Sequence, residues 1–301
     1  MKFNPDADLD TSGVEDIRGS GGGGGGRLPG GMGIPVGGGI GGIILLVVIL
    51  LLNGTLGGGG GSDQPAAQNT APGNLGSCKT GRDLQQNPQC RFVFYQNSIE
   101  GFWSAELPRR GKKYTKAQMI VFDGSVSTGC GPATSAVGPF YCPPDRRVYL
   151  DIGFFKTLQT DLGAKGGDFA EAYVVAHEYG HHIQNLYGIL DRIKSREGAS
   201  SDSVRSELQA DCLAGIWTNH ATTVPDKNGK TLISGLTEDD IANGLDAAAA
   251  VGDDRIQQKT QGQVTPESFS HGTAEQRMKW FKTGMDSGDM TRCDTWSANP
   301  L

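Results

Sequence analysis

The chain has 301 residues and is acidic, with 33 Asp and Glu against 27 Lys and Arg and a formal net charge of −6. This balance lacks the basic surface that nucleic-acid binding requires, so we exclude that class of function. The 47 glycines are unevenly distributed, because 22 fall in residues 1–62 and 25 in the remaining 239 residues. The split excludes a single uniform globule, and the absence of a G-X-Y period excludes a collagen-like chain.

One strongly apolar run lies within the glycine-rich part. Residues 43–52 read IILLVVILLL, and residues 36–56 carry no charged side chain. A helix of that length extends about 32 Å, close to the hydrocarbon thickness of a bilayer. No A-x-A cleavage site follows the run, so the pattern predicts an uncleaved transmembrane anchor rather than a signal peptide or a buried core helix.

The charges near this span predict its orientation. Lys2, Arg18 and Arg27 precede it, and no further Lys or Arg occurs until Lys79. The excess of positive charge on the N-terminal side places that side in the cytoplasm and makes the protein a single-pass protein of the cell membrane. The prediction divides the chain into a disordered cytoplasmic tail, the anchor, a flexible tether and an extracytoplasmic domain on the periplasmic side: residues 1–35, 36–56, 57–76 and 77–301.

All six cysteines lie in the part of the chain that is expected outside the cytoplasm. An even number of cysteines in an oxidising compartment is typical of a disulfide framework. The sequence does not decide among the fifteen connectivities that six cysteines allow. The simplest connectivity joins neighbours in sequence: Cys78–Cys90, Cys130–Cys142 and Cys212–Cys293.

Two amphipathic helices are predicted in the central part of the chain. Apolar side chains recur at three- and four-residue steps over 168–188, where Asp168 and Glu171 resemble a capping box and Gly188 is a typical end. A second helix is predicted over 203–220, which contains few helix breakers. The linker between the two is long enough to turn the chain back, so we expect the helices to run antiparallel.

The first of these helices contains HEYGH, an H-E-x-x-H motif. His177 and His181 are four residues apart and share one helix face, so both imidazoles can bind one Zn²⁺. Glu178 lies beside them and is placed to take a proton from a metal-bound water. His182 lies about 100° further round the helix, so we expect it to be a supporting or surface group rather than a ligand.

The third ligand must come from elsewhere in the chain. The longer metalloprotease pattern is absent, because Gln184 and Tyr187 occupy its last two places. On the second helix Glu207 and Asp211 are four residues apart, so Glu207 is expected to bind the metal while Asp211 holds a ligand histidine by its other nitrogen. Cys212 is also a possible ligand, but it faces about 140° away from Glu207.

The remaining pattern predicts an α+β fold, in which a small sheet precedes a helical subdomain that holds the metal. Further helices are expected over 238–252, opened by Thr237 and Asp240, and from about Thr273 to Asp286. The Gly- and Pro-rich stretch 124–146 is expected either to form one wall of a substrate cleft or to be a surface hairpin. Three short apolar or aromatic runs predict strands: residues 92–95, 119–123 and 147–151.

The two predicted helices carry a family resemblance. HEYGHHIQ, followed by RSELQADCLAGIW, resembles the putative neutral zinc metallopeptidase family of bacterial membrane-anchored proteins. More distantly it is similar to membrane gluzincins, which carry H-E-x-x-H and a later E-x-x-A-D. The likeness extends over most of residues 78–296, where it includes TGCG, GPFYCPPD, VYLD and SHGTAEQR, and it also includes VEDIRG at residues 14–19. It implies a zincin-like fold with one Zn²⁺ per chain.

The same resemblance bears on a possible oxyanion donor. Related gluzincins have a histidine followed by an arginine, and these correspond here to His271 and Arg277. His271 is therefore expected to stabilise the oxyanion of a tetrahedral intermediate, or else only to cap the helix that starts near Thr273. Tyr179, inside the metal motif, is a weaker alternative donor.

These features predict a zinc metalloendopeptidase that acts on peptide or protein substrates, with Zn²⁺ held by His177, His181 and Glu207 and with Glu178 as general base. The alternative is a non-catalytic, zinc-containing envelope protein that serves as a binding module. Glu178 favours the enzyme, because a purely structural site does not need it. A flexible spacer is excluded, because a spacer needs no set of two histidines and a glutamate.

Overall fold

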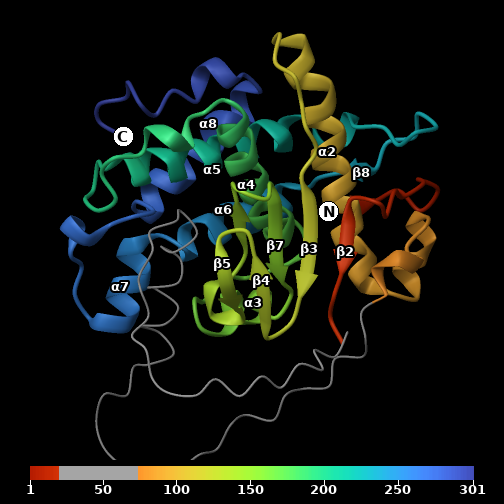
Figure 1. The fold of residues 1–301 in the computed structure, drawn as a ribbon, viewed down its shortest axis with the longest axis horizontal. Coiled ribbons are helices and arrows are strands. Elements are labelled where there is room, and N and C mark those ends of the chain that lie inside the picture. The colour runs from red at the N-terminus through yellow and green to blue at the C-terminus, as the bar shows by residue number, and fades with distance from the viewer. Residues whose placement is uncertain (20–73) are drawn as a thin grey trace, which may run out of the picture.

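The computed structural model describes residues 1–19 and 74–301. These residues form a mixed α+β fold around a four-stranded sheet (Figure 1). The strand order is β2–β3–β7–β6, in which β2, β3 and β7 are parallel and β6 is antiparallel to β7. The predicted strands at 119–123 and 147–151 are confirmed as β3 and β7. The four strands are β2 (Val14–Asp16), β3 (Gln118–Phe122), β7 (Arg147–Asp151) and β6 (Phe140–Cys142).

Helices pack against this sheet and against one another. The motif helix α4 contacts α2, α5 and α6, and α5 also packs on α8. The four helices expected from the sequence form within one or two residues of their predicted bounds. The helices are α2 (Arg91–Arg109), α3 (Phe154–Thr160), α4 (Asp168–Leu186), α5 (Asp202–His220), α6 (Glu238–Ala250), α7 (Asp253–Gln261) and α8 (Ala274–Ser287).

Small residues allow α5 and α8 to approach closely. A methyl group at Gly284 would lie 1.9 Å from the carbonyl oxygen of Cys212, and one at Gly215 would lie 2.1 Å from that of Phe281. No real side chain tolerates such contacts, so only glycine fits at either position. This packing fixes the helix that carries Glu207 against the C-terminal helix.

The strand predicted at 92–95 is wrong, because these residues begin the helix α2. All four side chains are buried, since this part of α2 is covered on several sides. A short run of buried apolar residues does not by its pattern distinguish a strand from a buried helix. The capping box predicted at Asp168 is also wrong: Gly167 precedes α4 without a side-chain cap, and Glu171 instead accepts hydrogen bonds from Arg91 at 2.5 and 2.9 Å.

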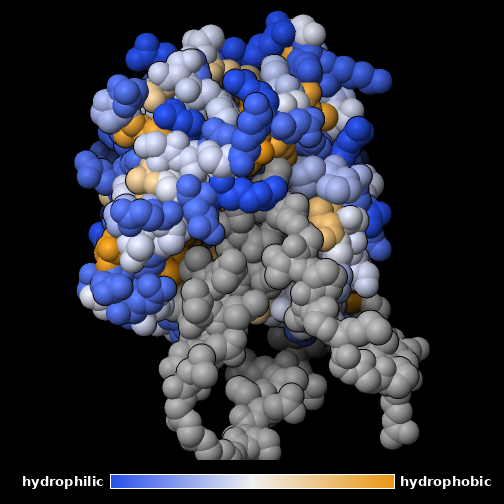
Figure 2. Space-filling model, turned by 60° about the vertical axis from the view of Figure 1, so that its left-hand side comes forward, coloured by the Kyte–Doolittle hydropathy of each residue, from blue (hydrophilic) through white to orange (hydrophobic). Residues whose placement is uncertain are grey.

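A β-hairpin and a small second core lie on the sheet near β6. The hairpin consists of β4 (Ser125–Thr128) and β5 (Gly131–Thr134), within the stretch 124–146. Apolar side chains from this stretch pack with sheet residues such as Phe122 and Tyr149 in a cluster separate from the main core. The molecular face in Figure 2 is mostly hydrophilic, and among the described residues only Tyr187 and Val264 are large, exposed apolar side chains.

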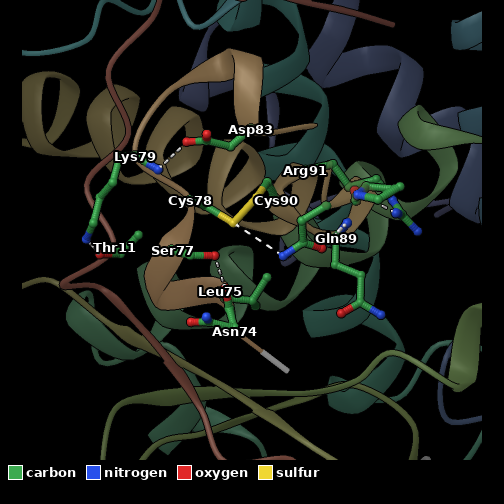
Figure 3. The surroundings of a disulfide bond; sticks show 12 residues. Thr11, Asn74, Leu75, Ser77, Cys78, Lys79, Asp83, Gln89, Cys90 and Arg91 are labelled. Atoms are coloured by element: carbon green, nitrogen blue, oxygen red, sulfur yellow. Dashed lines mark hydrogen bonds between the residues drawn. A yellow bond between two sulfur atoms is a disulfide. The ribbon is translucent and has the colours of Figure 1, made fainter. Parts of the chain in front are cut away.

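The three disulfides join the cysteines that are neighbours in sequence, so the simplest connectivity is the one that forms. Cys78–Cys90 lies at the start of α2 (Figure 3). The side-chain amide of Asn87 donates to the Cys78 sulfur. Cys130–Cys142 ties the hairpin loop to β6. Cys212–Cys293 joins α5 to the segment after α8. The last pairing excludes Cys212 as a metal ligand.

The N-terminal residues differ most from expectation. The prediction that residues 1–35 are disordered is wrong for 1–19, because β1 (Lys2–Phe3) pairs with β8 (Ile233–Gly235) and β2 pairs with β3. Low apolar content did not prevent folding here, since backbone hydrogen bonds of strands that are distant in sequence hold the segment. Ala7 and Leu9 supply the buried apolar contacts.

The predicted anchor at 36–56 lies outside the described residues. The same is true of the predicted tether up to residue 73, while Leu75 at its end is buried in the core. Within residues 1–19 and 74–301, no helix has the length and apolar character needed to span a membrane.

Candidate metal centre

Three side chains that the sequence singled out converge between α4 and α5. The Nε2 atom of His177 lies 3.1 Å from one carboxylate oxygen of Glu207, and the Nε2 atom of His181 lies 3.4 Å from the other. One ligand atom from each residue lies within 4.8 Å of the other two. Tetrahedral zinc with N and O ligands at 2.0–2.2 Å places ligand atoms about 3.3–3.6 Å apart, so the arrangement of these residues fits the metal.

Pairs of contacting residues establish that α4 and α5 run antiparallel, as predicted. Moving along α4 from Tyr173 to His181, the partners on α5 move back from Asp211 to Glu207. Two adjacent antiparallel helices therefore supply all three candidate ligands. The long helical backbones fix the positions of the ligands more firmly than a loop would.

A buried carboxylate supports His177 from the side away from Glu207. Asp211 is fully buried, and its Oδ1 accepts a hydrogen bond from Nδ1 of His177 at 2.8 Å and another from the Tyr173 hydroxyl at 2.6 Å. Arg277 donates to both oxygens of Asp211, at 2.9 and 3.0 Å. Because Asp211 holds the Nδ1–H of His177, the ring presents Nε2 toward Glu207, and Nε2 can bind a metal once it has lost its proton.

The charges in this network explain the protonation state of Asp211. Burial raises the pKa of Asp211, but the positive charges of Arg277 and His177 lower it by more. The net pKa of Asp211 therefore lies below its usual range. The carboxylate thus stays ionised although no water reaches it. Asp211 was predicted in this supporting role, and Arg277 was named only through the family resemblance. Tyr173 was missed, although its position four residues before His177 places it on the same helix face.

Glu178 is buried next to the cluster. Its side chain is 3% exposed, and burial raises its pKa above the ordinary value, while His177 and His181 oppose that effect. A carboxylate whose pKa is shifted toward neutrality accepts a proton more readily than an exposed one. The position therefore suits a general base beside a metal-bound water.

His271 lies in a second buried pair with Asp253, the first residue of α7. Its Nδ1 lies 3.1 Å from Asp253 Oδ1, while the other oxygen accepts backbone N–H bonds from residues 270–272. Burial lowers the pKa of His271, but Asp253 and then Glu207 raise it, so the net pKa lies above its usual value. The charge of Glu207 acts on His271, so the pair lies near the metal cluster. Asp253 carried no sequence signal, because it stands in no motif.

The structure excludes the helix-capping role of His271 and disfavours Tyr179 as the oxyanion donor. The helix α8 is capped by Thr273, whose hydroxyl accepts from the Gln276 N–H at 3.1 Å, so His271 is not its cap. Tyr179 is fully buried, and its hydroxyl lies near Gln96 and Glu100 of α2 rather than the metal cluster. His271 remains as the candidate donor.

His182 is neither a ligand nor a surface group. It is fully buried, and its two ring nitrogens contact the Tyr141 hydroxyl at 2.9 Å and the Thr115 carbonyl at 2.7 Å. Burial lowers the pKa of His182 to about 4, so the ring is neutral at physiological pH. Its function is to join α4 to β6 and to the segment before β3.

The fold and this cluster together define a mixed α+β protein with a candidate zinc site. A family profile described as "Putative neutral zinc metallopeptidase" matches residues 6–296, and the chain belongs to this family. The uncharacterized protein Rv2575 of Mycobacterium tuberculosis is 50% identical over 245 residues, covering 80% of this chain and 82% of that protein. The uncharacterized protein YpfJ of Escherichia coli K12 is 42% identical over 206 residues, covering 66% and 68%. No solved structure matches this chain.

Proposed function

We propose that this protein is a zinc metalloendopeptidase that hydrolyses peptide bonds with Glu178 as general base. The convergence of His177, His181 and Glu207 beside a buried glutamate carries the proposal. The fold fits a zincin-like domain, with a small sheet followed by helices that hold the candidate ligands. Membership of a family described as zinc metallopeptidases supports the same reaction class.

The candidate ligands are the Nε2 atoms of His177 and His181 and the carboxylate of Glu207. When bound, the zinc ion supplies Lewis acidity that lowers the pKa of a water molecule and polarises a carbonyl group. Glu178 accepts the proton of the attacking water and passes it to the leaving amine. Asp211, held by Arg277, keeps His177 in the tautomer and orientation that binding needs.

His271 is the proposed donor to the oxyanion of the tetrahedral intermediate. Its raised pKa keeps the imidazole protonated to higher pH than an ordinary histidine, and Asp253 holds it by Nδ1. The Nε2–H group is then available as a charged donor, whose hydrogen bond is stronger than that of a neutral group. The charge on the protonated ring matches the negative charge that develops on the oxygen.

The strand β6 is the proposed site for an extended peptide. It forms one edge of the sheet and is joined to α4, since the Tyr141 hydroxyl contacts both His182 and Asn185. An edge strand offers backbone N–H and C=O groups to a substrate in the extended conformation. In this proposal the hairpin joined to β6 by Cys130–Cys142 forms one wall of the cleft.

The three disulfides support a location in an oxidising compartment, outside the cytoplasm. We therefore propose that residues 77–301, called the metal domain from here on, are extracytoplasmic. Attachment of the protein to the membrane through residues 36–56 is also proposed, from the apolar sequence alone, and the side on which residues 1–19 lie is considered below.

Zinc-dependent cleavage by the purified full-length protein tests the proposed reaction. Bound zinc and hydrolysis of a mixed peptide library are measured for the wild type, for Glu178→Gln and for Glu275→Gln, an exposed control on α8. We expect equal zinc in all three, and a loss of about 10³-fold in kcat/KM for Glu178→Gln alone. Equal zinc without cleavage by the wild type would instead support a non-catalytic binding module.

A further inference from the structure

The N-terminal segment, defined as residues 1–19, is held by many contacts with the metal domain. Val14 pairs with Met119 in the parallel register of β2 and β3, and the Ile17 N–H donates to the Val121 carbonyl at 2.9 Å. The Leu9 N–H donates to the carbonyl of Lys79 at 2.8 Å. The pairing of β2 with β3 extends the central sheet by one strand, and the Leu9 bond joins the segment to the loop before α2.

The segment packs closely against the loop that precedes α2. A methyl group at Gly81 would lie 2.0 Å from the carbonyl oxygen of Asn4, so the two backbones touch. Gly81 stands within the loop closed by Cys78–Cys90, and in the same loop the ammonium group of Lys79 donates to the Thr11 hydroxyl at 3.0 Å (Figure 3). A loop that depends on an oxidised disulfide therefore forms part of the surface that binds the segment.

Two charged side chains of the segment form a buried ion pair. Arg18 donates to both carboxylate oxygens of Asp16 at 2.8 Å, and each side chain is 5% exposed. Asp16 additionally accepts the N–H of Leu75, which lies beyond the undescribed residues. Arg18 is one of the three charges that predicted a cytoplasmic N-terminus, yet here its charge is neutralised inside the folded domain.

We propose that residues 1–19 and the metal domain lie in the same compartment, on one side of the membrane. A bilayer about 30 Å thick cannot separate two strands that are hydrogen-bonded side by side. Gly19 and Asn74, which flank the undescribed residues, both belong to the described, folded part of the chain. One membrane crossing between Gly19 and Asn74 would separate the two, so this arrangement replaces both the single-pass topology and the opposite orientation of tail and domain that the sequence alone predicts.

The native cysteines make a labelling experiment possible. All six are in disulfides, so one introduced cysteine is the only free thiol. Glu15→Cys places a thiol on the exposed side of β2, and Gln263→Cys places a control thiol on an exposed loop of the metal domain. A membrane-impermeant maleimide is applied to intact cells whose outer permeability barrier has been opened. We expect both variants of the full-length protein to react equally before lysis. Reaction of Glu15→Cys only after lysis would overturn the proposal.

A stability measurement tests docking independently of the compartment. Asp16→Ala removes the carboxylate that pairs with the buried Arg18 in the described part of the chain, whereas Glu15→Gln changes the exposed neighbour on the same strand. We expect Asp16→Ala to lower the melting temperature of the full-length protein by about 5 °C or more, and Glu15→Gln to leave it unchanged. Equal melting temperatures for Asp16→Ala and the wild type would show that the segment is not docked.

A second inference follows from the hydrogen bonds of Gln184, which is fully buried. Its amide nitrogen donates to the Ser206 carbonyl at 2.7 Å and to the Gln209 side-chain oxygen at 3.1 Å. A backbone carbonyl only accepts, so the amide oxygen of Gln184 must face the other way, toward Nδ1 of His181 at 2.8 Å. That oxygen only accepts, so His181 carries its proton on Nδ1.

The geometry points to Gln184 as the positioning residue of His181. It frees Nε2 of His181 toward Glu207, as Asp211 frees Nε2 of His177. One candidate ligand is thus supported by a charged carboxylate and the other by a neutral amide. The inference rests on the proposed function, because it assigns a role within the same metal site.

Metal affinity tests this role without relying on peptide cleavage. Gln184→Leu cannot accept from His181, and Asn185→Ala removes the neighbouring amide, which binds Tyr141 and Pro143. Folding of the metal-free variants is checked by thermal melting. We expect zinc affinity to fall about 10- to 100-fold in Gln184→Leu and to be unchanged in Asn185→Ala.

The visible spectrum of bound Co²⁺ provides a second readout, because it responds to the geometry of the ligands. We expect an altered spectrum in Gln184→Leu only. Zinc affinity in Gln184→Leu equal to that of the wild type would contradict the role. If no variant and no wild-type protein cleaves peptides while Gln184→Leu still loses zinc, the peptidase proposal fails and the role of Gln184 stands.

Discussion

The metal centre and the N-terminal segment are both well packed, but they are encoded differently in the sequence. The two histidines of the centre are four residues apart, and Glu207 lies on the helix that follows in the chain. The strands of the N-terminal segment have partners that are 105 residues away, as Val14 and Met119 are, or further. A spacing rule detects the first arrangement, whereas the second depends on pairings between distant segments, which one sequence does not reveal.

The largest effect is expected from removal of the third ligand. Glu207→Ala leaves two histidines, which hold zinc far more weakly than three ligands, so we expect bound zinc to fall from one per chain to almost none. Metal analysis after dialysis measures this directly. His220→Ala, which removes a histidine that packs on Phe102 of α2, should keep one zinc per chain. Full zinc retention in Glu207→Ala would remove Glu207 from the centre.

Replacement of the proposed oxyanion donor should have the next largest effect. His271→Gln is expected to lower kcat/KM about 10²- to 10³-fold with zinc content unchanged. The pKa of His271 is raised, so the active, protonated form persists above the ordinary range and activity is lost as the pH rises through this raised pKa. Asp253→Asn should lower the pH at which this loss of activity occurs. An unchanged pH of activity loss in Asp253→Asn would show that Asp253 does not raise the pKa of His271.

A core truncation in the N-terminal segment should separate stability from metal binding. Leu9 is 6% exposed, and Leu9→Ala is expected to destabilise the protein by about 2–4 kcal/mol. We expect a lower melting temperature with one zinc per chain retained, because Leu9 does not touch the metal centre. Ser12→Ala, at an exposed position of the same segment, serves as the control. Loss of zinc in Leu9→Ala at a temperature where the protein is folded would couple the two regions.

The smallest expected effect is proton release when zinc binds. Burial lowers the pKa of His177, but Asp211 and Glu207 raise it, to about 10 in the metal-free protein. At pH 8 the ring is therefore doubly protonated, and binding through Nε2 must release about one proton. Calorimetry in buffers of different ionisation enthalpy counts the released protons. Zinc binding at pH 8 without proton release would contradict this protonation state.

Much of the helical part of the fold is predictable from local pattern. The helices α6 and α8 begin at Thr237 and Thr273, whose side chains cap them, as their sequences indicate. The helix α2 was mistaken for a strand, because its first residues are apolar on every side and have no readable period. Periodicity is informative only where a helix has one exposed face.

The candidate site is predictable to a similar degree. The sequence placed His177, Glu178, His181, Glu207 and Asp211 in one neighbourhood through two helical spacings, and the structure brings them together. Asp253 and Gln184 could not be assigned, because each acts through a contact that only the packing of helices creates. Side chains that bind a metal follow a motif, while the groups that hold them are set by tertiary structure.

Anomalous diffraction at the zinc edge, from crystals of the zinc-loaded full-length protein, tests the central claim most directly. The account predicts one strong peak, with Nε2 of His177, Nε2 of His181 and a carboxylate oxygen of Glu207 at about 2.0–2.2 Å. Nδ1 of the two histidines should remain bonded to Asp211 and Gln184. A peak at other residues, or none between α4 and α5, would contradict the account.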